Sequence, residues 1–255
     1  MTVWCTPQAA ADAQVGAELV LAVDASDSIE DWEWRLELSG IAAAFRDPDV
    51  QQDIAALPGR RIAVALLVWA GADAPHPSTG WQLVGTPNEA EAFASLVETY
   101  PRSTGGGTAM GEGVAASLRL LVTSPYASAR RIIDVSGDGV EPVPFLTERF
   151  VMMGEARAMV RSAGVTMNGL AIVKDQSGLI DWYADNVPVG RGAFVMQVHS
   201  MRDFAPAFKE KLLRELQPDL SLREGTEPVA VALVRVAKSG PGDASTNAGG
   251  VKFGH

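Results

Sequence analysis

The sequence predicts an α/β fold, built as a doubly wound, mostly parallel sheet with helices on both faces. Short apolar runs alternate along the chain with longer segments whose apolar residues recur every three or four positions. Some of these runs, such as 61–69 (RIAVALLVW), are apolar almost throughout, which is typical of strands covered on both faces. The 255 residues are enough for one large domain of this class together with a tail.

The predicted strands are the apolar runs that end in polar or glycine-rich residues. The first of them, 18–24, ends abruptly at Asp24, and the short run 81–84 suits an edge of the sheet. The full set of predicted strands is 18–24, 61–69, 81–84, 130–136, 165–173 and 193–198, with a further candidate at 228–237.

The predicted helices carry one apolar stripe each. The stripe of the first, 31–46, consists of Trp34, Leu38, Ile41 and Phe45. Ser28 and Asp31 fit a capping box ahead of this helix, and Pro48 is expected to end it. The other predicted helices are 88–100, a segment with Met110, Val114, Leu118 and Leu121 on one face, 145–163, a short one near 179–184, and 200–216.

The chain divides into a flexible N-terminus (1–16), one folded domain (17–216) and a largely disordered tail (217–255), whose end is low in complexity. Ala11-Asp12-Ala13 fits the cleavage site of a secretory signal, although the basic and apolar parts of such a signal are missing. A signal remnant and an ordinary disordered N-terminus therefore both stay open. The first implies a periplasmic or secreted protein, and the second a cytoplasmic one.

Composition excludes several classes of function. The formal net charge of −10 argues against binding to nucleic acid and to anionic membrane surfaces. No apolar stretch approaches the ~18–20 residues of a membrane span. The single cysteine, Cys5, allows no disulfide within the chain, and no His/Cys cluster has the spacing of a zinc site.

Three loops carry oxygen-bearing side chains at the points where predicted strands end or helices begin. Asp24, Ser26 and Ser28 follow the first strand, Thr108 follows three glycines, and Asp138 lies between two glycines. In open α/β sheets such loops meet at the carboxyl edge of the strands. Two carboxylates and three hydroxyls suit a small hard cation, and we expect Mg²⁺, with Mn²⁺ or Ca²⁺ as alternatives.

The sequence Asp24-x-Ser26-x-Ser28, followed by Gly107-Thr108 and then Asp138-Gly139, resembles the metal-ion-dependent adhesion site of von Willebrand factor type A (VWA) domains. The resemblance covers roughly residues 17–216 and is nearest to a bacterial branch, often exported, whose function is unassigned. It implies a Rossmann-like fold with one antiparallel edge strand. Asp27 is not part of the motif, and Ser136-Gly137-Asp138 departs from the commoner Thr-Asp.

The resemblance also implies a role for each residue of the site. Ser26, Ser28 and Thr108 would bind the metal directly, whereas Asp24 and Asp138 would act partly through water. A Glu or Asp carboxylate of a protein partner would complete the coordination shell. The resulting prediction is a metal-dependent, adhesion-type binding module that is not an enzyme.

Simpler interpretations exist for single residues. Ser28 and Thr108 both stand where helix N-caps belong, and Asp138 could serve only a turn. Asp134 could support the site from behind or pair with a nearby arginine, and the arginine pair is favoured.

The alternative function is a metal-dependent hydrolase in which the same ion activates water. His76, in one of the loops expected to form the rim (70–80, 139–145 and 174–192), is the candidate general base, although a solvated loop histidine is the favoured interpretation. No G-x-S-x-G elbow and no phosphate-binding loop occurs in the sequence.

Overall fold

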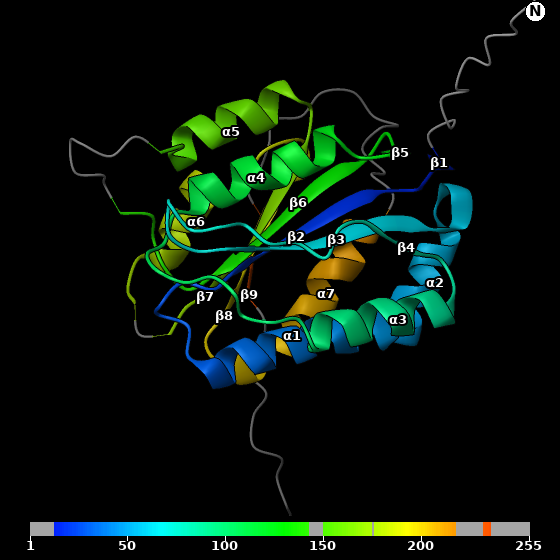
Figure 1. The fold of residues 1–255 in the computed structure, drawn as a ribbon, viewed down its shortest axis with the longest axis horizontal. Helices are drawn as coiled ribbons and strands as arrows, with labels where there is room; N and C mark the ends of the chain where they lie inside the picture. Colours follow the sequence, from blue (N-terminus) through cyan, green and yellow to red (C-terminus); the bar gives the residue numbers. More distant parts are fainter. Residues whose placement is uncertain (1–12, 143–149, 175, 218–231, 236–255) are drawn as a thin grey trace, which may run out of the picture.

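The computed structural model describes residues 13–142, 150–174, 176–217 and 232–235. Within them, a seven-stranded sheet with the order β4-β3-β2-β6-β7-β8-β9 forms the centre of the molecule (Figure 1). The strands of this sheet are β2 (Glu18–Asp24), β3 (Ile62–Trp69), β4 (Gln82–Val84), β6 (Arg131–Gly137), β7 (Thr166–Ile172), β8 (Phe194–Val198) and β9 (Ala232–Arg235). The two-residue strands β1 (Ala13–Gln14) and β5 (Tyr126–Ala127) pair separately.

The sheet is parallel except at one edge. β4 pairs with β3 in antiparallel register, and every other neighbouring pair in the sheet is parallel. The predicted fold class, including the antiparallel edge strand, is confirmed. β2 is central, and its last residue, Asp24, lies beside Trp69 of β3. Asp24 therefore stands at the carboxyl edge of the sheet, between two neighbouring strands that end at the same level.

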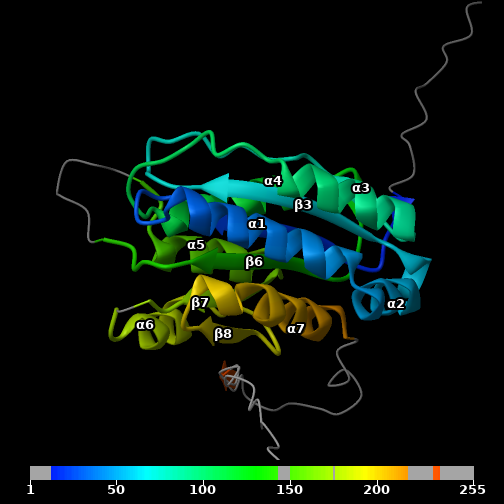
Figure 2. The same ribbon diagram turned by 90° about the horizontal axis from the view of Figure 1, so that it is seen from below.

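Helices cover both faces of the sheet, as Figures 1 and 2 show. One layer contains α1 (Asp31–Arg46), α2 (Pro48–Ala56), α3 (Pro87–Glu98) and α7 (Phe204–Leu216). The other contains α4 (Met110–Val122), α5 (Met153–Ser162) and α6 (Leu179–Asn186). Alternate residues of β2 enter the two cores, since Leu19, Leu21 and Val23 face the first layer and Val20 and Ala22 the second.

The first helix has the predicted bounds, but its capping box differs from the expectation and an unpredicted helix follows it. The helix begins at Asp31, but its capping box is formed by Glu30 and Glu33, so the box predicted from Ser28 and Asp31 is wrong. The helix ends at Arg46, before Pro48 as predicted, and Pro48 also opens a second helix, α2, because a proline at the first turn of a helix leaves no hydrogen bond unmade. The Asp47 carboxylate caps α2 by accepting from the Asp49 N–H at 2.9 Å.

Later elements are shorter than the periodicity suggested. α4 is preceded by Ala109, so Thr108 is not its N-cap residue. The helix predicted over 145–163 is present as α5, with 143–149 outside the described residues. The segment 200–216 begins with a 3₁₀ turn, η2 (Met201–Asp203), before α7, and another such turn, η1 (Pro58–Arg60), precedes β3.

The two ends of the chain lie mostly outside the described residues. This applies to residues 1–12 of the predicted flexible N-terminus, with its possible signal remnant, and to 218–231 and 236–255 of the predicted tail. The candidate strand at 228–237 is present as β9, which pairs with β8. No helix in the described ranges is long and apolar enough to cross a membrane.

Candidate metal centre

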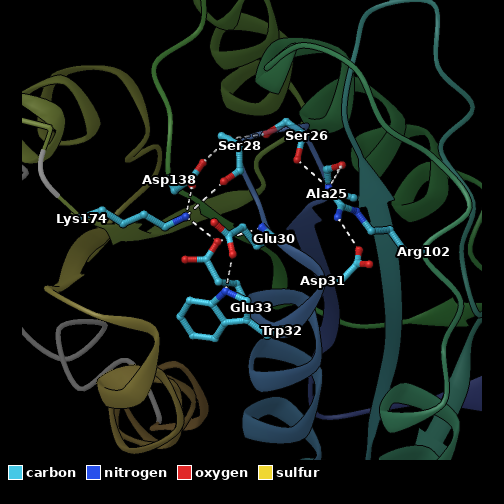
Figure 3. Close-up of polar contacts among 10 residues, drawn as sticks. All are labelled: Ala25, Ser26, Ser28, Glu30, Asp31, Trp32, Glu33, Arg102, Asp138 and Lys174. Atoms are coloured by element: carbon cyan, nitrogen blue, oxygen red, sulfur yellow. Dashed lines mark hydrogen bonds and ion pairs between the residues drawn. The ribbon is translucent and has the colours of Figure 1, made fainter.

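The structure brings the loop after β2 into contact with the loop after β6. The Ser26 and Ser28 hydroxyl oxygens lie 3.0 Å apart, and the Ser28 hydroxyl donates a hydrogen bond of 2.6 Å to Asp138 Oδ1 (Figure 3). A hydroxyl that donates its proton to a carboxylate keeps its lone pairs for another partner. The hydroxyl oxygens of the two serines can therefore offer lone pairs to a cation while the Ser28 hydroxyl donates its hydrogen bond to Asp138.

Thr108 comes to the same place from the loop before α4. A Cβ atom built on Gly139 would lie 3.2 Å from the Thr108 hydroxyl oxygen, so the threonine side chain closes on the backbone directly after Asp138. The absence of a side chain at Gly139 makes this approach possible. Together with Asp24 at the end of β2, all five predicted ligand residues belong to three loops at one edge of the sheet.

Asp24 lies at the bottom of the site and is fully buried. Its Oδ1 accepts the Ser26 N–H at 2.7 Å, whereas Oδ2 has no hydrogen-bond partner among the described residues. Burial raises the pKa of this carboxyl to about 7. A buried carboxyl group that has one oxygen without a partner, and that interacts with the Ser26 hydroxyl and with Asp138, fits a bound cation or a water molecule of its coordination shell.

The depth of the five side chains changes across the site. Asp24, Ser26 and Asp138 are buried, Thr108 is half-buried and Ser28 is exposed. A cation held here would be closed off on the side of the sheet and accessible on the side of the loops. Within the described part of the chain no group of three or more His, Cys, Asp or Glu side chains gathers as a possible metal site, so a cation at this edge of the sheet would need hydroxyl oxygens among its ligands.

Two charged side chains that were not among the predicted ligands form hydrogen bonds that fix the positions of these loops. Arg102 donates hydrogen bonds to the Ala25 and Ser26 carbonyl oxygens at 3.2 and 2.8 Å (Figure 3). Asp27, which the motif leaves unassigned, accepts the Gly106 N–H at 2.9 Å and donates its own N–H to the Gly106 carbonyl at 2.9 Å. The glycine-rich loop is thereby joined to the Asp-x-Ser-x-Ser loop. The only feature of the sequence that could have pointed to these contacts is the position of Arg102 directly before the glycine-rich loop.

Lys174 is the third residue that sequence reasoning did not place in the site. It follows β7 and forms ion pairs with Asp138 Oδ2 at 2.8 Å and with Glu33 Oε2 at 2.6 Å. Lys174 was predicted to lie on the rim, but no pattern in the sequence linked it to Asp138, because the two residues belong to different loops.

Carboxylates on the α1/α7 side of the sheet form a separate buried group. Asp134 forms an ion pair with Lys211 of α7, so the predicted arginine partner is wrong and the partner is a lysine. Glu37 of α1 accepts a hydrogen bond of 2.7 Å from the Ser136 hydroxyl, and burial raises its pKa to about 8. These residues support β6 from beneath rather than provide ligands at the edge of the sheet.

His76 shows no arrangement expected of a general base. The side chain is half-buried, and its Nε2 has no hydrogen-bond partner among the described residues. Burial lowers its pKa, and the charged groups that also act on it are Glu112 and Arg119 of α4. Nothing in this geometry favours the hydrolase alternative.

Comparisons with known proteins agree with this architecture. A family model described as "Protein of unknown function (DUF1194)" matches residues 14–220. No curated protein matches the sequence. Among solved structures, the pilus adhesin SpaC of Lactobacillus rhamnosus GG superposes with a TM-score of 0.57 at 14% identity, over 80% of this chain and 31% of the adhesin.

Two further solved structures have the same fold. The vWF domain of the type V pili tip protein Mfa5 from Porphyromonas gingivalis superposes with a TM-score of 0.54 at 8% identity, over 85% of this chain and 98% of that domain. Proximal thread matrix protein 1 from the mussel byssus gives a TM-score of 0.51 at 15% identity, over 80% of this chain and 46% of that protein. The fold is thus that of a VWA domain.

The coverage and the sequence identity of these matches limit what can be concluded from them. This chain spans less than half the length of SpaC and of the byssus protein. At such low identity the likeness concerns the fold alone. The names of the three structures are those of adhesins, pilus components or a matrix protein and not of enzymes.

Proposed function

Because the chain belongs to the DUF1194 family and carries the VWA fold, we propose that it is an adhesion-type binding module that depends on a divalent metal ion. The observation that carries the proposal is the convergence of two carboxylates and three hydroxyls at the edge of the sheet, with the buried Asp24 Oδ2 left without a partner among the described residues. Hydroxyl and carboxylate oxygens are ligands of hard cations, and Mg²⁺ is the proposed ion, with Mn²⁺ or Ca²⁺ as alternatives.

The proposed roles are those that the resemblance to metal-ion-dependent adhesion sites implies. Ser26, Ser28 and Thr108 would bind the ion directly, and Asp24 and Asp138 would bind it partly through water. Two carboxylates formally neutralise a divalent ion, and neutral hydroxyl ligands leave it electrophilic. When bound, the ion would supply a Lewis-acid position on the exposed side of the site, next to Ser28.

The proposed partner is a protein that presents an Asp or Glu carboxylate to this position. The net charge of −10 would repel an acidic partner as a whole, so the carboxylate must belong to a surface that is otherwise neutral or basic. Export to the periplasm or the exterior is proposed with this role, because the similar folds named above belong to pilus and thread proteins.

Calorimetric titration with Mg²⁺ and Mn²⁺ tests the metal site. We expect saturable binding to the wild type and none to Asp24→Ala, whereas Glu155→Gln, an exposed substitution on α5, should bind as the wild type does. Binding that is equal in all three proteins, or absent from the wild type, would refute the proposed centre.

Immobilised peptides test the proposed partner chemistry. Peptides with a central Asp or Glu, on a neutral or basic background, should retain the protein in Mg²⁺ and release it in chelator, and their Asn or Gln counterparts should not retain it. Retention that is insensitive to chelator, or equal for acids and amides, would contradict capture through the metal.

A further inference from the structure

The Lys174 ammonium has a full set of three acceptors at the candidate metal centre. Its Nζ lies 2.8 Å from Asp138 Oδ2, 2.6 Å from Glu33 Oε2 and 3.2 Å from the Ser28 carbonyl oxygen (Figure 3). An ammonium has three N–H donors, so these contacts use all of them. The contacts place a positive charge of the protein itself next to two residues of the proposed coordination shell.

Both carboxylate oxygens of Asp138 are engaged by this arrangement. Oδ1 accepts from the Ser28 hydroxyl and Oδ2 from Lys174. The Asp138 side chain is only 3% exposed, so bulk water has little access to it as a substitute partner. A divalent cation that uses Asp138, directly or through a water molecule, must therefore share this carboxylate with the ammonium or take it over.

We propose that Lys174 is an internal cation that competes with the divalent ion for Asp138, and thereby lowers the affinity of the centre for metal. The inference rests on the proposed metal-binding function. Two cations that share one carboxylate repel each other, and the repulsion is strong where the carboxylate is shielded from water. The protein would accordingly load its metal only where the free ion is abundant enough to overcome the ammonium.

Glu33 makes this exchange feasible without expelling the lysine. Its side chain is 6% exposed and lies in the first turn of α1, where its Oε2 also accepts the Glu30 N–H. The ammonium can stay on Glu33 and the Ser28 carbonyl when Asp138 turns to the metal. Because the Lys174 side chain is 32% exposed, water can supply the third acceptor. The lysine then exchanges one partner and not its whole environment.

The test compares the metal affinity of four proteins: the wild type, Lys174→Met, Lys174→Arg and Lys209→Met. Lys209 is a matched control, since its side chain is also 32% exposed and forms two ion pairs, with Asp47 and Asp49, beside α2. Titrated with Mg²⁺ and Mn²⁺, Lys174→Met should bind at least about tenfold more tightly than the wild type. Lys174→Arg keeps the charge and should stay near the wild type, as should Lys209→Met.

Thermal unfolding separates competition from a merely structural role. After removal of metal by chelator, Lys174→Met should melt below the wild type, because Asp138 and Glu33 lose their cation. Saturating Mg²⁺ should then raise its Tm by more than it raises that of the wild type. A lower Tm without tighter metal binding would overturn the inference and leave Lys174 a structural residue. If Lys174→Met does not fold, Lys174→Gln removes the charge while keeping an N–H donor for Asp138.

The outcomes for the inference and for the proposed function are distinct. Metal binding to the wild type with equal or weaker binding to Lys174→Met overturns the competition alone. Binding to Lys174→Met but not to the wild type supports the competition and refutes metal dependence of the native protein. Failure of both to bind Mg²⁺ and Mn²⁺ refutes the metal centre and the competition with it.

Discussion

Glu37 should make the stability of this protein fall as the pH rises. Its side chain is fully buried between α1 and β6, where Oε1 accepts the Ser136 hydroxyl and Oε2 has no partner among the described residues. Burial is the largest cause that raises the pKa of this carboxyl from 4.5 to about 8. The group is therefore mostly neutral at pH 7 in the folded protein and ionised in the unfolded chain.

The sign of the effect follows from the protons bound by each state. Between pH 4.5 and about 8 the folded state holds a proton that the unfolded chain has lost, so stability decreases across this range. The stabilising contribution is complete below the unfolded pKa and is lost as the pH passes the folded pKa. A shift of this size corresponds to an upper limit of about 5 kcal/mol in the free energy of unfolding.

Glu37→Gln replaces the carboxyl by an amide that stays neutral at every pH. At pH 5 the protonated native carboxyl carries one O–H donor at Oε2, whereas the NH₂ group of the new amide carries two N–H donors there. The variant therefore buries one more donor and should be less stable by about 1–3 kcal/mol. At pH 9 the wild type buries a charge and the variant does not, so the variant should become the more stable protein. The difference between the two should change by several kcal/mol, up to the limit of about 5 kcal/mol.

Urea unfolding at pH 5, 7 and 9, in chelator so that metal binding does not contribute, measures this difference. Glu155→Gln is the control, because Glu155 is exposed on α5 on the opposite face of the sheet, and its stability difference should not vary with pH. A constant difference between Glu37→Gln and the wild type over this range would refute the assignment of a buried neutral carboxyl to Glu37.

Three further outcomes are expected. Lys211→Met should lower the free energy of unfolding, measured in urea titrations, by about 3–5 kcal/mol, because it leaves the two carboxylates that pair with this buried lysine without a cation. A loss below ~1 kcal/mol would contradict a buried ion cluster. Arg102→Ala should weaken Mg²⁺ binding in calorimetry by about tenfold, since it frees the two carbonyls of the Asp-x-Ser-x-Ser loop, whereas an unchanged affinity would mean that the loop is held without it. Mg²⁺ affinity should also fall when the pH is lowered from 8 to 6. Burial raises the pKa of Asp24 to about 7, and this carboxyl must lose its proton to act as a ligand. An affinity independent of pH would argue against Asp24 as a ligand.

Local patterns predicted the elements that build the site with little error. The strand Glu18–Asp24 and the helix Asp31–Arg46 have the predicted bounds, because an unbroken apolar run and a helical stripe are both complete within one short segment. The helix α2 was missed because proline is a signal for two opposite events, the end of one helix and the first turn of the next, and only the Asp47 cap decides between them.

For the predicted ligand residues, too, the sequence predicted some features and missed others. The order of Asp24, Ser26, Ser28, Thr108 and Asp138 along the strands was enough to predict that they meet, because parallel strands end at one edge of the sheet. The motif could not indicate what each residue contacts. Ser28 donates to a carboxylate 110 positions away, and Arg102 binds carbonyls 76 and 77 positions away.

The sequence by itself determined the class of fold, the edge of the sheet at which the candidate site lies and the oxygen-bearing side chains present there. These depend on periodicity and on the order of elements, which are properties of the linear chain. Only the tertiary structure shows that Asp24 Oδ2 is buried without a partner in the described residues and that Lys174 forms an ion pair with Asp138. Burial and charge pairing arise when loops from distant parts of the chain pack together, and no local pattern encodes them.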